Sequence, residues 1–218
     1  MKMLDLFAGT GSVSDAFRKA GWETYSVDWD KKFDVDLHAD ISKLTADDII
    51  GLCGGRPDVI WASPDCTSYS VMAISYHREK VDGVLRPKTD YAKFCDATNQ
   101  HVLELIEELK PRYFFIENPV GALRKMPFIT SREDAGLMTR HTVTYCQYGE
   151  RRQKPTDLWT NHPDPKFKPA CKRGSPCHDA APRGSRSGTQ KIKGSKDRAR
   201  IPVQLCEHIV EICGGDRL

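Results

Sequence analysis

The stretch MLDLFAGTGSVSDAFRKAG, residues 3–21, joins a short apolar run, a glycine-rich turn and a helical pattern. The run Met3–Phe7 is apolar except at one position and stops at Gly9, which predicts a buried strand that ends in a tight turn. Apolar residues then recur at helical spacing before a closing glycine: Val13, Ala16, Phe17 and Ala20. A strand, a glycine turn and a helix in succession are typical of the first unit of a parallel α/β sheet.

The same alternation continues to about residue 150. Apolar runs predict further strands at residues 24–27, 58–62, 113–116, 141–146 and 157–160. Residues 101–109 have a helical period, and residues 201–213 form another helical pattern with an apolar stripe that can pack on the core: Leu205, Ile209 and Ile212. We therefore predict a doubly wound, largely parallel sheet.

Length and composition favour a globular protein of one domain with a small appendage. The chain has 218 residues, of which 39% are hydrophobic and 29% charged. No apolar run approaches the roughly 20 residues that span a bilayer, and no secretory signal is recognisable. The eight cysteines are spread singly, so we expect free thiols and a cytoplasmic location without membrane contact.

Positive charge is concentrated near the carboxyl end. Residues 166–200 contain eleven lysines and arginines but only two acids, whereas the rest of the chain is net negative. Residues 161–200 are also rich in proline, glycine and serine and lack a sustained apolar period, which predicts a loop-dominated insert. Such a basic block favours a nucleic-acid partner, and a solvated basic loop is the alternative.

The ends of the first strands carry groups that suit a nucleoside-containing cofactor. Gly9 and Gly11 allow a ligand to approach the backbone closely, but Ser14 replaces the third glycine of the dinucleotide fingerprint, which counts against NAD and FAD. Asp28 can bind ribose hydroxyls and Trp29 can stack on an adenine, while Asp40 adds a third acid. Ordinary turn and cap residues are the alternative for each acid.

A cysteine and a glutamate follow two other predicted strands. Cys66 lies in a proline turn after the strand at 58–62, and Glu117 directly follows the strand at 113–116. The carboxyl ends of parallel strands meet at one edge, so we expect Glu117 to face Cys66. A buried structural cysteine and a simple cap are the alternatives. A thiol beside a proton donor suggests covalent catalysis.

These stretches together resemble the DNA (cytosine-5)-methyltransferase family. DLFAGTGS at residues 5–12 is similar to the family's cofactor turn, and SPDCTSYS at 63–70 is similar to its Pro-Pro-Cys-Gln-x-Phe-Ser loop. IENPV at 116–120 matches its Glu-Asn-Val strand end, and YGERRQK at 148–154 lies where the family has Phe-Gly-x-Pro-Gln-x-Arg-x-Arg. Four blocks in the family's order span residues 3–156.

The resemblance implies a Rossmann-like, S-adenosylmethionine-dependent methyltransferase sheet with a small irregular recognition insert. Cys66 would attack C6 of a flipped cytosine in DNA while Glu117 protonates N3, which activates C5 for methylation. Asn118 would orient the loop, and Lys154 would contact the base. The cofactor would lie on a set of residues at the strand ends: Asp5, Phe7, Ala8, Gly9, Thr10, Gly11, Asp28, Trp29, Asp40, Ile41 and Pro64.

On this basis we divide the chain into three parts. Residues 1–160 form the catalytic cofactor-binding domain, 161–200 the basic target-recognition segment, and 201–218 a helix that packs back on the catalytic domain. The recognition segment is much shorter than is typical of the family, so the chain resembles a small, divergent, phage-like member. We expect a monomer in the cytoplasm of a bacterial or phage-infected cell.

Departures from the family motifs keep other functions open. Asp65 replaces the second proline of the cysteine loop, and its carboxylate should raise the pKa of the neighbouring thiol. An RNA (tRNA) cytosine-5 methyltransferase and a catalytically impaired nucleic-acid-binding relative are the competing hypotheses. Amino-directed methylation would need an Asp/Asn-Pro-Pro-aromatic loop, which SPDC at residues 63–66 does not supply.

The insert also contains metal-ligating residue types. Cys171, Cys177 and His178 lie close in sequence, with His162 nearby, and zinc could staple a loop that has no core of its own. Their spacing fits no standard zinc finger. Free thiols, a surface histidine and no metal are therefore the default interpretation, with zinc as the alternative.

Overall fold

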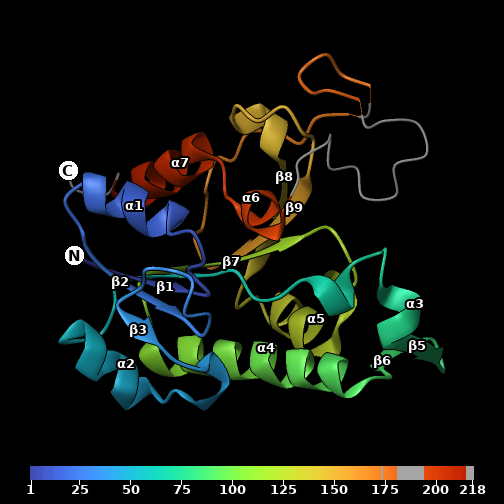
Figure 1. Ribbon diagram of the computed structural model, residues 1–218, viewed down its shortest axis with the longest axis horizontal. Helices are drawn as coiled ribbons and strands as arrows, with labels where there is room; N and C mark the ends of the chain where they lie inside the picture. The colour runs from blue at the N-terminus through green and yellow to red at the C-terminus, as the bar shows by residue number, and fades with distance from the viewer. Residues whose placement is uncertain (173, 181–193, 215–218) are drawn as a thin grey trace.

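A seven-stranded sheet forms the centre of the protein, for which the computed structural model describes residues 1–172, 174–180 and 194–214. Figure 1 shows helices on both sides of this sheet. The strand order is β3-β2-β1-β4-β7-β9-β8. The bounds are β1 Lys2–Leu6, β2 Glu23–Asp28, β3 Leu37–His38, β4 Val59–Ala62, β7 Tyr113–Pro119, β8 Thr139–Thr144 and β9 Pro155–Thr160.

The five strands from β3 to β7 are parallel, whereas β9 runs antiparallel to β7 and β8 runs antiparallel to β9. The chain moves outward from β1 to β2 and β3, and then returns to place β4 on the other side of β1. This reversal makes the carboxyl ends of β1 and β4 a topological switch point, where open α/β sheets bind their ligands.

Alternating side chains of the strands divide the core between the two faces. In β1, Met3 packs with the helices α1 (Ser12–Lys19) and α7 (Val203–Gly214), whereas Leu4 and Leu6 pack on the opposite face. That opposite face is covered by α2 (Ala46–Cys53), α4 (Asp90–Leu109) and α5 (Pro127–Asp134). The largest fully buried side chains, Trp61 among them, come mainly from the sheet and its edges.

Local sequence signals explain where the helices begin. Thr45 and Asp48 form a reciprocal capping box at the start of α2, and the Thr89 side chain accepts the Ala92 amide at the start of α4. Burial of Leu205 and Ile209 holds α7 against α1, and each such side chain contributes about 1.5–3 kcal/mol when fully buried.

Short elements complete the described chain. An antiparallel hairpin joins β5 (Arg78–Val81) to β6 (Val84–Pro87), next to the short helix α3 (Ile74–His77), and α6 (Ser195–Ala199) precedes α7. Four 3-10 turns are η1 (Ile41–Lys43), η2 (Thr67–Tyr69), η3 (Leu123–Lys125) and η4 (Tyr145–Tyr148). None of the helices in the described ranges has the length and apolarity that crossing a lipid bilayer requires.

The mixed α/β fold predicted from the sequence is confirmed, with local corrections. The strand expected over residues 141–146 ends at Thr144, because Tyr145 and Cys146 turn into η4. The helical period at 101–109 is only the last half of α4. The carboxyl-terminal stripe packs on the core as expected: Ile212 is partly buried against the same cluster as Leu205 and Ile209, and Cys206 and Cys213 are buried with them. The three-part division of the chain stays a prediction.

Candidate active site

The turn between β1 and α1 has an unusual backbone that opens it to a ligand. Phe7, Gly9 and Gly11 all have positive φ angles, of 61°, 54° and 70°. A Cβ added at Gly11 would meet no atom within 4 Å, so the space above the turn is open. The Ala8 amide donates to the Val27 carbonyl at 3.1 Å, which ties the turn to the end of β2.

The carboxylate of Asp28 organises this turn. Its Oδ2 accepts the Gly9 amide at 2.9 Å, and its Oδ1 accepts the Asp30 amide at 2.9 Å. A carboxylate offers about four acceptor positions, so two remain for a ligand. The adjacent Trp29 is 72% exposed, which leaves its indole free to stack on a flat ring.

Asp40 lies beyond β3 and caps η1. Its Oδ1 accepts the amide and the hydroxyl of Ser42, at 3.1 and 2.7 Å. The Ser42 hydrogen bond lowers the pKa of Asp40, with a smaller contribution from Lys43. Ile41 is buried beneath this turn. The structure therefore gives Asp40 the cap role that was its alternative interpretation, and its second oxygen, Oδ2, lies 3.4 Å from the exposed ammonium of Lys43.

Asp5 is buried under the glycine turn and does not point into open solvent. Its Oδ2 accepts the Ser14 hydroxyl at 2.5 Å and the Ser14 amide at 3.3 Å. Burial raises the pKa of Asp5 to about 7, and the Ser14 hydrogen bonds partly offset this rise. Ser14, which occupies the place of a third glycine, thus has a structural role in holding strand to helix.

The loop after β4 presents Cys66 at the start of η2. The buried Pro64 carbonyl accepts the Asn118 side-chain amide at 3.0 Å, which joins this loop to the end of β7. The exposed Asp65 folds back, so that its Oδ1 accepts the Thr67 amide at 2.6 Å. The Cys66 side chain is half-buried between these fixed points.

Cys66 is a poorly ionised thiol in the free protein. Its pKa is raised to about 11, by burial first and then by the negative charges of Glu117 and Asp65. The Lys154 ammonium acts in the opposite direction. The direction expected for Asp65 from the sequence is therefore confirmed, although burial is the larger cause.

Glu117 is buried at the end of β7, opposite the cysteine. Its Oε1 accepts the Tyr145 hydroxyl at 2.9 Å and lies 3.9 Å from Lys154 Nζ. Lys154 also lies over the Tyr145 ring, at 4.4 Å from its centroid. Burial lowers the pKa of Lys154, and the Glu117 charge counteracts this effect. Carboxylate, phenol and ammonium thus form one connected polar group.

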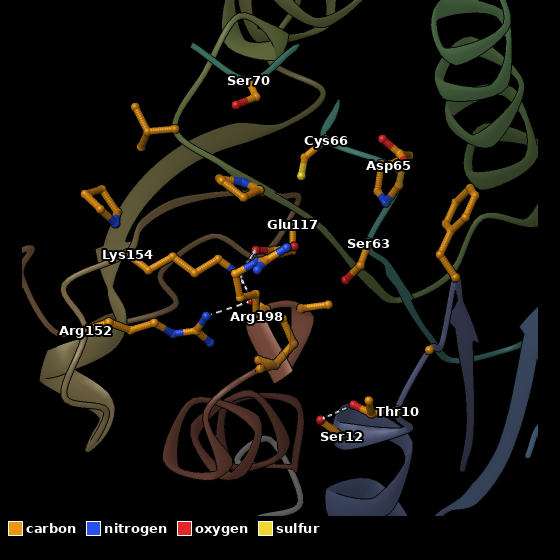
Figure 2. Close-up of a pocket in the computed structure, with 18 of the residues that line it drawn as sticks. Thr10, Ser12, Ser63, Asp65, Cys66, Ser70, Glu117, Arg152, Lys154 and Arg198 are labelled. Atoms are coloured by element: carbon orange, nitrogen blue, oxygen red, sulfur yellow. Dashed lines mark hydrogen bonds and ion pairs between the residues drawn. The ribbon is translucent and has the colours of Figure 1, made fainter. Parts of the chain in front are cut away.

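A single cleft of about 1060 Å³ connects the glycine turn with these groups. Figure 2 shows Cys66 and Glu117 directed into it from two sides, with Lys154 entering from the loop that precedes β9. Among the sequence-predicted residues, the cleft is lined by Asp5, Phe7, Ala8, Gly9, Thr10, Pro64, Cys66, Glu117 and Lys154. Gly11, Asp28, Trp29, Asp40, Ile41 and Asn118 are not part of its lining.

A buried network behind the cysteine loop was not anticipated from the sequence. Arg78 of β5 donates to the Ser68 carbonyl at 2.8 Å and to the Asp96 carboxylate at 2.7 Å, and Tyr69 donates to the same carboxylate at 2.7 Å. This network fixes η2 against α4. The signal that could have located the hairpin is its Asp-Gly turn at 82–83, where both residues have positive φ.

Arg152 closes the far wall of the cleft and was also missed. It pairs with Glu150 and donates to the Arg198 carbonyl at 2.8 Å and the Arg200 carbonyl at 3.2 Å. These bonds bring residues 198–200 back to the cleft, where Figure 2 shows Arg198 beside Lys154. Part of the basic segment, residues 173 and 181–193, lies outside the described residues.

The cysteines and histidine of the insert are gathered near η4. Cys171, Cys177 and His178 have their ligating atoms close together, and Cys146 joins them. His162 does not belong to this group: its Nε2 lies 3.3 Å from the Ile212 carbonyl, and its ring packs on Tyr113. The structure thus replaces the expected nearby histidine with a cysteine from η4.

Comparisons with known proteins show which family the chain belongs to. Residues 1–129 match the model of the family described as C-5 cytosine-specific DNA methylase. The chain is 27% identical over 233 residues to a probable DNA (cytosine-5)-methyltransferase of frog virus 3 (isolate Goorha), covering 98% of this chain and 100% of that protein. It is 29% identical over 175 residues to the type II methyltransferase M.AgeI of Thalassovita gelatinovora, covering 68% of this chain and 36% of that protein.

Solved structures show the same fold. The methyltransferase EhMeth of Entamoeba histolytica superposes with a TM-score of 0.53 at 14% identity, over 79% of this chain and 57% of that one. The chain therefore spans little more than half of that structure and about a third of M.AgeI, although it spans the whole of the frog virus protein. Since the family model matches more than half of its residues, the chain belongs to the C-5 cytosine-specific DNA methylase family.

Proposed function

We propose that this protein transfers a methyl group from S-adenosylmethionine to C5 of cytosine in DNA, through a covalent bond between Cys66 and C6. The observation that carries this proposal is that Cys66 and Glu117 enter one cleft that begins at the glycine turn. Membership of a cytosine methylase family supports the choice of base and atom.

The residues around the glycine turn fit the cofactor. S-adenosylmethionine supplies an electrophilic methyl group on a positively charged sulfur. The open space above Gly11 can admit part of such a molecule, and Asp28 keeps acceptor positions for ribose hydroxyls. The exposed indole of Trp29 can cover the adenine. Asp40 has a second carboxylate oxygen, held near Lys43, that can face an amino group.

Cys66 supplies the nucleophile. The loss of its proton to solvent gives a thiolate, whose sulfur forms a bond to C6 of the cytosine. Because the pKa of this thiol is raised to about 11, the thiolate is scarce until the loop meets its substrate. Lys154 is the cation that favours the thiolate, and Asn118 holds the loop in place through the Pro64 carbonyl.

Glu117 controls the charge on the base. Its carboxyl group donates a proton to N3 as the sulfur attacks C6, so that electron density moves to C5 and a bond to the methyl carbon can form as the bond between that carbon and the sulfur of the cofactor would break. Loss of the C5 proton to solvent, cleavage of the sulfur–C6 bond and return of the N3 proton to Glu117 then release 5-methylcytosine. The hydroxyl of Tyr145 and the ammonium of Lys154 hold the carboxylate in one orientation.

The target base has to leave the helix stack. C6 of cytosine is unreachable inside a duplex, so the cleft would receive a flipped cytosine. Positive side chains of residues 166–200 supply the phosphate contacts that hold the surrounding DNA. We further propose that the protein acts as a monomer in the cytoplasm of a bacterial or phage-infected cell, where its cysteines stay reduced; those of the described structure are free thiols.

A covalent trap tests the mechanism. The protein is incubated with S-adenosylmethionine and a long duplex of mixed sequence that contains 5-fluorocytosine, whose fluorine cannot leave C5. We expect a denaturation-resistant protein–DNA complex that requires the cofactor. Cys66→Ala should abolish it, whereas the matched thiol control Cys53→Ala, in a cysteine buried at the end of α2, should retain it.

Two outcomes would contradict the proposal. A wild-type protein that binds the duplex but forms no adduct would be a nucleic-acid-binding relative without this activity. Preferential methyl transfer to tRNA over duplex DNA, measured with radiolabelled cofactor, would assign the RNA substrate instead.

A further inference from the structure

Three cysteine sulfurs and one histidine nitrogen converge where the insert forms one wall of the cleft. They belong to Cys146 of η4 and to Cys171, Cys177 and His178 of the insert, and all four ligating atoms lie within 4.8 Å of one another. The cysteines come from positions separated by as many as 31 residues in the chain. The insert supplies three of the ligands, and the fold brings the fourth, Cys146, from η4 at the edge of the sheet.

The separations match a tetrahedral zinc ion. Bonds of about 2.3 Å to sulfur and about 2.0–2.1 Å to nitrogen place two sulfurs about 3.8 Å apart and a sulfur about 3.6 Å from the nitrogen. The Sγ atoms of Cys146 and Cys177 are 3.6 Å apart, and His178 Nδ1 lies 3.5 and 3.6 Å from the sulfurs of Cys177 and Cys171. The Cys146–Cys171 separation, 3.2 Å, is shorter but far from a disulfide bond.

Neighbouring amides are placed to stabilise bound thiolates. Gln147 Nε2 lies 3.3 Å from the sulfur of Cys177, and Gln153 Nε2 lies 3.2 Å from the sulfur of Cys171. Donors of this kind orient metal-ligating sulfurs and tune their charge. The Cys171 amide is itself fixed by the Thr144 hydroxyl at 2.9 Å. The sulfurs of Cys171 and Cys177 thus each have a side-chain amide donor, and the backbone of Cys171 is also held in place.

We propose that Cys146, Cys171, Cys177 and His178 bind one zinc ion in a structural Cys₃His site. Four protein ligands leave no open coordination position, which distinguishes a structural site from a catalytic one. The proposal does not depend on methyl transfer.

The position of the site indicates what the metal would hold together. Cys146 follows Tyr145, which binds Glu117, whereas Gly174, Ser175 and His178 line the cleft from the insert. The ion would therefore fasten the wall of the cleft at η4 to the basic insert, residues 161–200. An ion pair between Arg151 and Asp179 at 2.8 Å lies beside the same junction. A loop without a hydrophobic core gains its order from such a metal.

Metal analysis of the full-length protein tests this inference. Protein purified from zinc-supplemented cells and desalted should contain one zinc per chain by mass spectrometry of the metal. Cys177→Ser is the principal variant, because the Cys177 side chain is exposed and its loss leaves the core intact. We expect at least about a tenfold drop in bound zinc, and cobalt(II) in the wild-type site should give the visible bands of tetrahedral thiolate coordination.

Control variants separate this site from the other cysteines. Cys53→Ala and Cys66→Ala should each retain one zinc, although the latter removes the proposed nucleophile. His178→Ala should lose zinc and His178→Cys should keep it, because four cysteines also form a closed zinc site. A chelator should lower the melting temperature of the wild-type protein but not that of Cys177→Ser.

Three results would overturn the inference. The first is a folded wild-type protein that contains no zinc and takes up none when zinc is added. The second is a disulfide between Cys146 and Cys171 in freshly purified protein, found by peptide mass spectrometry. The third is a loss of zinc in Cys66→Ala as complete as the loss in Cys177→Ser.

Discussion

Replacing Asp65 with asparagine should make Cys66 more reactive at neutral pH. The pKa of the thiol is raised to about 11 by burial first, then by the charges of Glu117 and Asp65. At pH 7.5 only about three molecules in ten thousand then carry the thiolate, which is the reactive form. Asparagine removes the Asp65 charge but keeps the oxygen that accepts the Thr67 amide, so the loop geometry is preserved.

The magnitude follows from the exposure of Asp65. A solvent-screened like charge on the neighbouring residue raises a pKa by about 0.5–1 unit, so its removal increases the thiolate fraction about three- to tenfold. A thiolate of lower pKa is also a weaker nucleophile, with a Brønsted coefficient of about 0.4–0.5, which cancels part of the gain. We therefore expect alkylation of Cys66 to accelerate about two- to fourfold.

The assay is pulsed alkylation with iodoacetamide between pH 7 and 9.5, followed by mass spectrometry of the Cys66 peptide. Measurement by peptide separates this thiol from the other seven cysteines. The matched control is Asp47→Asn, which removes an exposed acid from the first turn of α2. An unchanged or slower rate in Asp65→Asn, or an equal acceleration in Asp47→Asn, would refute the electrostatic explanation.

Three further substitutions probe the site and its support, and a fourth, Gly51→Ala, is the control for the last of them. Glu117→Gln retains an acceptor for the Tyr145 hydroxyl but cannot donate the carboxyl proton. Methyl transfer measured with labelled cofactor should therefore fall about 10²–10⁴-fold, at an unchanged melting temperature. A loss of activity below tenfold would exclude the proposed role. Arg78→Met leaves a buried carboxylate unpaired and should cost about 3–5 kcal/mol of unfolding free energy in urea titrations, and a cost near zero would show that the ion pair is dispensable. Gly121→Ala places a Cβ 2.5 Å from the Tyr69 carbonyl oxygen and should cost about 1–3 kcal/mol in the same titrations, because main-chain atoms must move. Gly51→Ala, in a helix with open space, should instead add about 0.5–1 kcal/mol, and equal effects at the two glycines would contradict the steric argument.

Much of the fold could be predicted because its signals are local. Six strands of the main sheet were predicted near their observed bounds. Four of them are parallel strands, which form short apolar runs between turns, and the other two, β8 and β9, are antiparallel. Cys66 and Glu117 were also located, because Cys66 follows one of these strands and Glu117 lies near the end of another. The carboxyl ends of parallel strands meet at one edge of the sheet. A position at the end of two such strands was therefore sufficient to place both residues at one cleft.

Other parts of the site had no local signal. Arg78 lies in a charged hairpin and becomes buried only because α4 supplies Asp96 and η2 supplies Tyr69. The cap role of Asp40 and the burial of Asp5 likewise depend on neighbours that a periodic pattern does not reveal. In a sequence, a charged residue that will be buried looks the same as one that stays in solvent, until its partners are known.

The sequence by itself determined the alternation of strands and helices, the glycine turn and the two reactive side chains, because each depends on residues that are neighbours in the chain. Only the tertiary structure decided that Tyr145 and Lys154 hold Glu117, and that Cys146 joins Cys171, Cys177 and His178. The run at 141–146 was predicted as a strand, and Cys146 within it was expected only to be one of eight free thiols. The sheet edge instead turns into η4 at Tyr145, and this turn brings the Cys146 sulfur to within 3.2 Å of the Cys171 sulfur.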